Sequence, residues 1–267
     1  MSRSNLNKYV LVFGGTGAIG SACAVLLAKE GFGIISVYRE RRAALKDKQK
    51  RLHVIDKSAR DVKYLNINAT DVSNENTIMR FIEESLSTKN AQIVLVLDAI
   101  ADANINDMFG KTEMNEHLSV EDVSRTVSAM GTGLFRWVQL LMKKGFLSDD
   151  CRIIGLTSIG VERCISGYAA TASAKAVLET MSKYMAVELK GNRMTSNVIR
   201  AGVIVTEAYS KLPNADFLAS RAKDKHPKGR LTQPEDVANV VSLLMRPEAD
   251  WINGAIIDVD GGERLIG

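Results

Sequence analysis

Residues 9–20 have the sequence Tyr9-Val10-Leu11-Val12-Phe13-Gly14-Gly15-Thr16-Gly17-Ala18-Ile19-Gly20. The apolar run predicts a buried strand, and Ser21 to Glu30 is predicted to be a helix. Such a strand–turn–helix points the unpaired N–H groups of the helix N-terminus at a ligand above the strand, usually a pyrophosphate. Gly14 permits a tight turn, Gly17 a close approach to phosphate, and Gly20 close packing of helix on strand. Dinucleotide binding is therefore predicted, with a ligand-free glycine-rich turn as the alternative.

Composition and charge set broad limits on the rest of the chain. The 267 residues are 46% hydrophobic and 25% charged, as is usual for globular proteins, and the net charge of +4 does not favour nucleic-acid binding. No apolar run approaches the roughly 20 residues that cross a bilayer, and the first ten residues are too polar for a signal peptide. Cys23, Cys151 and Cys164 match no metal-ligand spacing and predict free thiols in a reducing compartment. We expect a cytoplasmic protein without a metal site or membrane association.

Short apolar runs alternate with helical patterns along the whole chain. After the first strand, strands are predicted at 33–37, 62–67, 93–97, 152–157, 195–200 and 255–259. Helices are predicted at 41–51, around 78–86, and at 123–144, 168–190 and 235–245. This alternation predicts an α/β fold, in which residues 1–267 form a single doubly wound Rossmann domain with a parallel sheet of about seven strands. Residues 205–228 interrupt the pattern and are expected to form a lid over the substrate.

The residues after the second strand bear on the choice of cofactor. In doubly wound sheets, ligands bind beyond the carboxyl ends of the strands. An acidic residue after the second strand binds the 2′-hydroxyl of NAD, whereas arginine accommodates the 2′-phosphate of NADP. Arg39, Arg41 and Arg42 outnumber Glu40 here, so NADPH is favoured over NADH. The alternative is a solvated helix start, with Glu40 near the helix N-terminus.

A second group of polar residues follows the fifth strand. Tyr168 and Lys175 are seven residues apart, which places them on nearly the same face of a helix. A phenol has a pKa of about 10, and a nearby lysine would favour its anion. Lys175 could also reach ribose hydroxyls, and Ser158 ends the fifth strand near the same crevice. These three residues are the predicted catalytic group. The alternative is a tyrosine and a lysine that merely decorate a helix in an oligomer interface.

These motifs resemble the short-chain dehydrogenase/reductase superfamily over essentially the whole chain. The resemblance rests on the glycine turn, Asp71-Val72, the Tyr/Lys helix and two C-terminal stretches, residues 229–238 and 252–262. The commoner branch has its tyrosine four residues before the lysine, where this chain has Thr171. The Tyr-x6-Lys spacing is instead similar to that of enoyl-acyl-carrier-protein reductases. The stretches 158–163, 183–189 and 201–206 resemble the same branch.

The resemblance implies roles for particular residues. In the family, the loop after the sixth strand packs on the nicotinamide. By this resemblance, the backbone of Ile204 would bind the carboxamide of the nicotinamide, and Thr206 would contact the phosphates. The cofactor-binding residues implied by the turn and by the resemblance are Gly14, Thr16, Gly17, Ile19, Gly20, Arg39, Asp71, Val72, Ala99, Lys175, Ile204 and Thr206.

Several positions depart from the family pattern. Asp98-Ala99-Ile100-Ala101 replaces the usual Asn-Asn-Ala-Gly, Val203 replaces a proline, and Ala129 falls where carbonyl reducers often have a proton-relay asparagine. Loss of that asparagine disfavours alcohol dehydrogenation more than enoyl reduction.

The leading hypothesis is therefore an NADPH-dependent reductase of enoyl thioesters in fatty acid or polyketide-type biosynthesis. Hydride would attack the β-carbon, and Tyr168 would hydrogen-bond to the enolate oxygen. A carbonyl reductase of specialised metabolism and a non-catalytic dinucleotide sensor remain alternatives. Lys223, Lys225, Lys228 and Arg230 would suit an acidic acyl carrier protein, although such runs are usually solvated. A homotetramer formed through the helices at 123–144 and 168–190 is expected from the family alone.

Overall fold

The computed structural model describes residues 7–87, 90–109, 117–189, 193–206, 209–211 and 215–266. The side chains of residues 42–47, 49, 211, 215, 216, 218, 221 and 225 lie outside that description. Within the described residues, seven parallel strands form one sheet in the order β3-β2-β1-β4-β5-β6-β7. The strands are β1 (Lys8–Phe13), β2 (Gly33–Tyr38), β3 (Val62–Asn66), β4 (Gln92–Asp98), β5 (Leu147–Ser158), β6 (Thr195–Ala201) and β7 (Ile256–Val259). The predicted doubly wound parallel sheet is confirmed.

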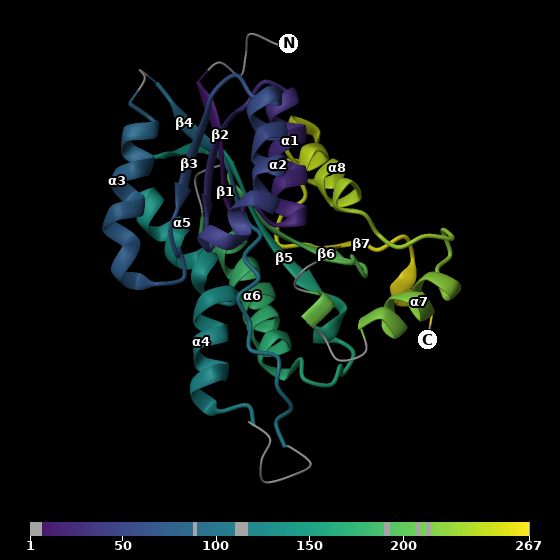
Figure 1. Cartoon of the computed structure of the whole chain (residues 1–267). Coiled ribbons are helices and arrows are strands. Elements are labelled where there is room, and N and C mark those ends of the chain that lie inside the picture. The colour runs from purple at the N-terminus through teal and green to yellow at the C-terminus, as the bar shows by residue number, and fades with distance from the viewer. Residues whose placement is uncertain are drawn as a thin grey trace.

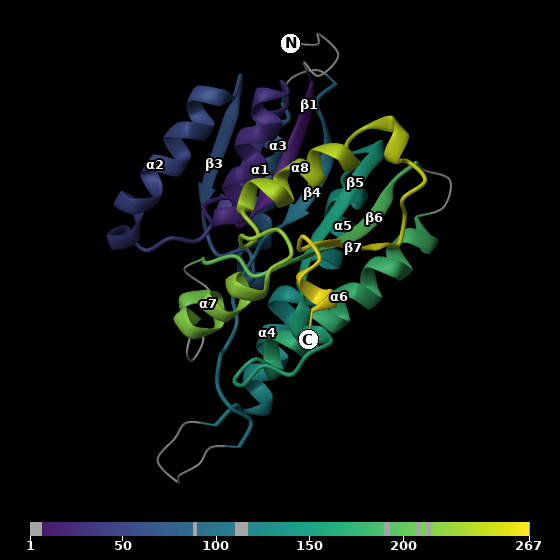
Figure 2. The same cartoon turned by 90° about the vertical axis from the view of Figure 1, so that its right-hand side faces the viewer.

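Helices cover both faces of this sheet, as Figures 1 and 2 show. The helices are α1 (Ala18–Lys29), α2 (Arg42–Ser58), α3 (Glu75–Ser85), α4 (Val120–Met130), α5 (Gly133–Lys143), α6 (Ala169–Glu188), α7 (Ala215–Lys225) and α8 (Pro234–Leu244). One core packs α1, α2 and α8 against the sheet, and a second packs α3, α5 and α6 against the opposite face. The central strand β4 is buried almost throughout, as expected for its uninterrupted apolar run.

One predicted helix proved wrong. The single helix expected at 123–144 is two helices, because α4 ends at Met130 and α5 begins at Gly133. The backbone N–H groups of Gly131 and Thr132 both donate to the carbonyl oxygen of Val127, at 2.8 and 3.0 Å, and this closes α4. A Cβ at Gly131 would lie 2.9 Å from the carbonyl oxygen of Ala174 in α6. The absence of a side chain therefore lets α4 and α6 pack closely at the break.

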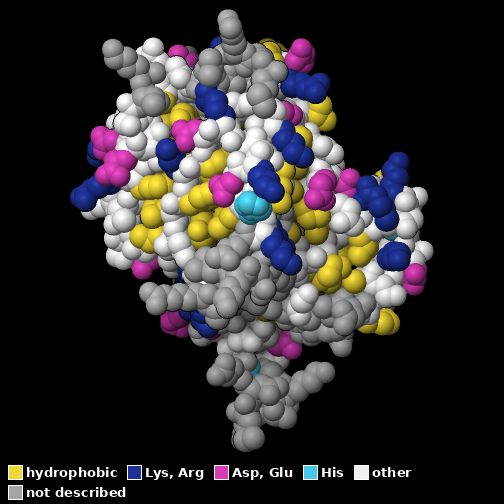
Figure 3. Space-filling view, turned by 45° about the horizontal axis from the view of Figure 1, so that its top comes forward, with side chains coloured by type: hydrophobic (Ala, Val, Ile, Leu, Met, Phe, Trp, Pro, Cys, Tyr) yellow, Lys and Arg dark blue, Asp and Glu magenta, His cyan; other side chains and the backbone are white. Residues whose placement is uncertain are grey.

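The surface shows no dominant charge on the face seen in Figure 3. Lysine and arginine side chains are interspersed there with aspartate and glutamate. Among the described residues, no helix is long and apolar enough to cross a membrane, and no cluster of three or more histidine, cysteine, aspartate or glutamate side chains could hold a metal ion.

Candidate active site

The glycine turn between β1 and α1 has no room for side chains at two positions. Gly14 has a φ of +81°, and a Cβ on it would lie 2.6 Å from the carbonyl oxygen of Ala99. A Cβ on Gly20 would lie 2.4 Å from the carbonyl oxygen of Gly14. Gly17 is the N-cap of α1, and no side chain caps that helix. The first turn of α1 therefore keeps free N–H groups beside a tightly folded loop, which fits a bound pyrophosphate.

A continuous cleft runs beyond the carboxyl ends of the strands. Its nucleotide end is a cavity of about 330 Å³ that includes the glycine turn and the ends of β2 and β3. Its second part, of about 260 Å³, contains Ser158, Tyr168 and Lys175. Both parts are lined by Ile19, Ala99, Ile100, Ala101 and Thr206. A ligand could therefore extend from the glycine turn to the tyrosine without leaving the cleft.

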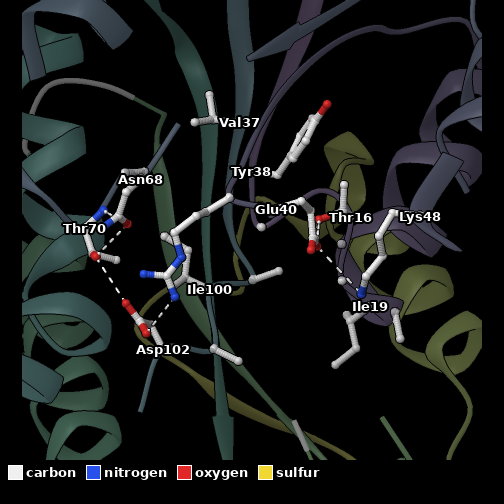
Figure 4. A pocket seen from close by; sticks show the side chains of 18 of the residues that line it. Thr16, Ile19, Val37, Tyr38, Glu40, Lys48, Asn68, Thr70, Ile100 and Asp102 are labelled. Atoms are coloured by element: carbon white, nitrogen blue, oxygen red, sulfur yellow. Dashed lines mark hydrogen bonds and ion pairs between the residues drawn. The ribbon is translucent and has the colours of Figure 1, made fainter. Parts of the chain in front are cut away.

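Two polar clusters face each other across the nucleotide end of the cleft (Figure 4). On one side, a guanidinium nitrogen of Arg39 donates to a carboxylate oxygen of Asp102 at 3.0 Å, and Thr70 donates to the other oxygen at 3.3 Å. On the other side, the Thr16 hydroxyl donates to Glu40 at 2.8 Å, and the ammonium of Lys48 lies 3.7 Å from the same carboxylate oxygen. The nucleotide end thus holds both cations and carboxylates.

The tyrosine side of the cleft is built by α6 and the end of β5. Tyr168 is the N-cap of α6, and its hydroxyl lies 3.1 Å from the Ser158 hydroxyl. Gly160 leaves room for the ring, since a Cβ there would lie 2.5 Å from it. Burial raises the pKa of Tyr168, and the Ser158 hydrogen bond lowers it in part. The net rise in pKa favours the neutral phenol over the expected lysine-stabilised anion.

Lys175 is buried near a second buried ionisable group, Asp98. Desolvation lowers the pKa of Lys175, and the charge of Asp98 raises it in part. Desolvation also raises the pKa of Asp98 to about 6, against the opposing effects of Lys175 and of a 3.0 Å hydrogen bond from the Ile100 N–H. Asp98 ends β4, beside Phe13 of β1 and Gly155 of β5. The position that departs from the family asparagine thus supplies a carboxyl group to the environment of the lysine.

A network of ion pairs supports the strand end that carries Ser158. Thr157 donates to the buried Glu179 of α6 at 2.7 Å, and Arg200 lies 3.7 Å from the same carboxylate. Arg200 also pairs with Glu162 at 2.8 Å and with Asp258 at 3.1 Å. These contacts join β5, α6, β6, β7 and the loop between Ser158 and Tyr168.

Most of the predicted site residues lie along this cleft. Those that line it are Gly14, Thr16, Gly17, Ile19, Gly20, Arg39, Ala99, Ser158, Tyr168, Lys175, Ile204 and Thr206. Asp71 and Val72 do not line it. The carboxylate of Asp71 instead accepts hydrogen bonds from the N–H and hydroxyl of Ser73, at 2.9 and 2.7 Å, and caps a short 3₁₀ helix. β3 ends at Asn66, so Asn68 and Thr70 occupy the cavity wall where Asp71 and Val72 were expected.

Sequence reasoning missed several residues of the cleft. Asn68, Thr70, Asp102, Lys48 and Arg51 line the nucleotide end, and Thr171 and Tyr209 line the tyrosine end. Asp102 follows β4 closely enough for the carboxyl-end rule to have included it. In the expected lid, Thr206 and Tyr209 line the cleft and Phe217 is exposed. Leu212 lies outside the described residues, and the side chain of Leu218 is not described either.

Comparisons with known proteins find relatives over nearly the whole chain. Residues 15–263 match the family described as Enoyl-(Acyl carrier protein) reductase. The chain is 29% identical to an NADPH-dependent aldehyde reductase-like protein, chloroplastic, of Arabidopsis thaliana, with 96% of this chain and 93% of the relative covered. It is 28% identical to the enoyl-[acyl-carrier-protein] reductase [NADH] FabI of Enterococcus faecalis, with 97% and 98% covered. The solved structure of the promiscuous reductase LugOII has the same fold, with a TM-score of 0.82, 22% identity, and 98% and 99% of the two chains covered.

Proposed function

Because this chain belongs to the enoyl-(acyl carrier protein) reductase family of the short-chain dehydrogenase/reductase superfamily, we propose that it is an NADPH-dependent reductase of enoyl thioesters. The coarser activity, an oxidoreductase of this superfamily, follows from family membership. The finer assignment rests on one observation: Tyr168 stands at the start of α6, seven residues before Lys175, with its hydroxyl 3.1 Å from Ser158.

The residues of the cleft fit a nicotinamide dinucleotide and the reduction of a conjugated double bond. The glycine turn would hold the pyrophosphate and Lys175 the nicotinamide ribose, and NADPH when bound supplies the hydride. Hydride adds to the β-carbon, negative charge develops on the thioester oxygen of the substrate, and a proton taken up from solvent at the α-carbon completes the reduction. The neutral phenol of Tyr168 donates a hydrogen bond to that oxygen, and the Ser158 hydroxyl orients the phenol. A buried donor is more effective here than in water, because the surroundings are less polar.

The choice of NADPH rests on the cations at the nucleotide end. Arg39, Lys48 and Arg51 line the cavity together with the carboxylates Glu40 and Asp102. The Glu40 carboxylate accepts from Thr16 and faces the Lys48 ammonium through one and the same oxygen, so its negative charge is partly balanced by a neighbouring cation. Arg39 lies at the end of β2 with an exposed side chain that a 2′-phosphate could reach. NADH is the less favoured cofactor.

Reduction of a carbonyl group is the second candidate. A hydroxyl pair of serine and tyrosine can also bind a carbonyl oxygen, and the Arabidopsis relative is named as an aldehyde reductase. The buried Ala129 argues against this candidate, because it offers no side-chain amide to a proton relay.

A carrier-bound form of the substrate is part of the proposal. Lys223 and Lys228 are exposed, whereas Arg230 is engaged by Asp236 at 2.6 Å. The two lysines are therefore the better candidates for contact with an acidic carrier protein. A crotonyl group on carrier protein should be reduced with a lower KM than crotonyl-CoA, and Lys223→Glu should remove that difference without affecting crotonyl-CoA.

The substrate panel that tests the function compares a double bond with a carbonyl group. Crotonyl thioester, acetoacetyl thioester and a simple aldehyde are supplied with NADPH, and its oxidation is followed by absorbance, with NADH in a parallel series. We expect turnover of the crotonyl thioester with NADPH. Turnover of only the ketone or the aldehyde would move the protein to the carbonyl-reducing branch. NADPH binding without turnover of any substrate would contradict the enoyl assignment and favour a sensor.

A further inference from the structure

The loop after β6 is held to the C-terminal segment of the chain by two consecutive backbone N–H groups. Gly202, Val203 and Ile204 of this loop line the tyrosine end of the cleft. The Gly202 N–H donates to the carbonyl oxygen of Val259 at 3.1 Å, which continues the pairing of β6 with β7. The next N–H, that of Val203, donates to the carboxylate of Glu263 at 2.9 Å. A side chain therefore replaces the backbone acceptor where β7 has ended.

The turn after β7 fixes the backbone that carries Glu263. Gly261 and Gly262 have φ angles of +60° and +90°, which end the strand in a tight turn. The Asp260 carboxylate accepts from the N–H groups of Gly262 and Arg264, at 2.9 and 2.8 Å. The N–H of Glu263 donates to the carbonyl oxygen of Asp260 at 3.0 Å. The Glu263 carboxylate thus reaches the loop from a turn that is itself held by several hydrogen bonds.

The residue types at positions 202 and 203 make this contact possible. A Cβ on Gly202 would lie 2.7 Å from the Glu263 carboxylate, so a side chain there would displace it. Val203 stands where the family pattern has a proline, and a proline has no N–H to donate. The N–H that valine brings to this position needs an acceptor, and a charged carboxylate is a stronger acceptor than a neutral group.

We propose that Glu263 is a positioning residue for the reaction, an inference that rests on the proposed function. Its carboxylate holds the backbone of Val203 and so keeps the buried Ile204 at the place where the nicotinamide would bind. Glu263 is not among the described residues that line the cleft, so it acts through the loop rather than on the ligand. A loop that is already ordered costs less free energy on binding than one that the ligand must order.

The matched variants are Glu263→Ala, which removes the acceptor, and Glu263→Gln, which keeps an oxygen that can accept. Leu265→Ala is the control, because Leu265 lies in the same 3₁₀ helix (Glu263–Leu265) and is 79% exposed. Dissociation constants are measured for NADPH and for 2′-phosphoadenosine 5′-diphosphate, which lacks the nicotinamide and its ribose. Glu263→Ala should weaken NADPH binding by about three- to tenfold and leave the shorter ligand unaffected. Glu263→Gln and Leu265→Ala should bind both ligands within about twofold of the wild type.

A double-mutant cycle with Val203→Pro tests the contact itself. Proline removes the N–H, so Glu263→Ala should have no further effect on NADPH binding in this background. Equal weakening by Glu263→Ala in both backgrounds would show that the carboxylate acts elsewhere and would overturn the assignment. The comparison of Glu263→Ala with Glu263→Gln needs no proline and stands if Val203→Pro does not fold.

Thermal unfolding separates positioning of the loop from a role in the fold alone. A lower Tm of Glu263→Ala with unaltered NADPH affinity, or equal weakening of both ligands, would overturn the proposal. Wild-type protein that binds neither NADPH nor NADH would contradict the proposed function as well. Normal wild-type binding with an unaltered Glu263→Ala would contradict this inference alone.

Discussion

The side chains of Arg39 and Asp102 meet at 3.0 Å on one side of the nucleotide end of the cleft, one following β2 and the other following β4. These strands flank β1, so the ion pair crosses the region above the glycine turn. Both side chains are partly exposed, and such pairs contribute little to stability. The pair is therefore easily opened by a ligand that competes for the guanidinium group.

The first prediction is that Asp102→Asn tightens the binding of NADPH. The carboxylate both occupies Arg39 and would repel a 2′-phosphate bound there. Its removal should lower the dissociation constant of NADPH by about three- to tenfold and leave that of NADH almost unchanged. Arg39→Gln should have the opposite effect, weakening NADPH selectively. Fluorescence titration of both cofactors measures this, and equal changes for NADPH and NADH would show that the pair does not act on the 2′-phosphate.

A second prediction concerns the glycine turn. Gly20→Ala places a methyl group 2.4 Å from the carbonyl oxygen of Gly14, so the turn must shift. We expect a lower Tm and a loss of NADPH binding of at least about tenfold. Gly133→Ala is the control, because its Cβ would lie at an ordinary 3.4 Å from the nearest atom, and it should retain wild-type binding. Normal NADPH affinity in Gly20→Ala would contradict the placement of the pyrophosphate at this turn.

The third prediction is a dependence of stability on pH that comes from Asp98. Its pKa is about 6 in the folded protein, against an ordinary value of 3.8. Because the folded-state pKa is raised, the contribution of Asp98 to stability is complete below about pH 4 and is lost as the pH rises through 6. The unfolding free energy of the wild type should therefore fall relative to that of Asp98→Asn across this range, by about 2 to 3 kcal/mol. Denaturant titrations at pH 4, 5, 6 and 7 measure the difference, and a constant difference would contradict the assignment.

Asp98 should also affect the protonation of Lys175. The carboxylate raises the pKa of Lys175, which burial lowers. Asp98→Asn removes the favourable charge, so Lys175 should lose its proton at a lower pH than in the wild type. If the charged lysine holds the nicotinamide ribose, the alkaline decline of NADPH binding should begin at lower pH in the variant. Superimposable pH profiles of the dissociation constant would argue that Asp98 does not influence the lysine.

The sequence was sufficient to predict the strands of the sheet and many of the residues that line the cleft. The alternation of strands and helices together with the carboxyl-end rule located both ends of the cleft, because parallel strands deliver their following loops to one edge. The break at Gly131 was missed although two glycines, Gly131 and Gly133, stood in the predicted helix, because helical periodicity continues on both sides of it.

Other features depended on local geometry that the sequence does not reveal. The Asp71-Val72 motif resembled the family, but β3 ends at Asn66, so the chain reaches the cavity with Asn68 and Thr70, and Asp71 caps the next turn. The pKa of Tyr168 was expected to fall beside Lys175. Burial and Ser158 control it instead, since spacing along a helix does not determine the distance between the ends of two long side chains.

The most direct test of the proposed function is the effect of Tyr168→Phe on crotonyl thioester reduction, with NADPH binding measured on the same preparation. The variant removes the one hydroxyl assigned to the enolate oxygen and keeps the ring. We expect kcat to fall by about 100-fold or more, as for other donors to a developing negative charge, while the NADPH dissociation constant stays within about twofold of the wild-type value. Undiminished crotonyl turnover in Tyr168→Phe would contradict the account.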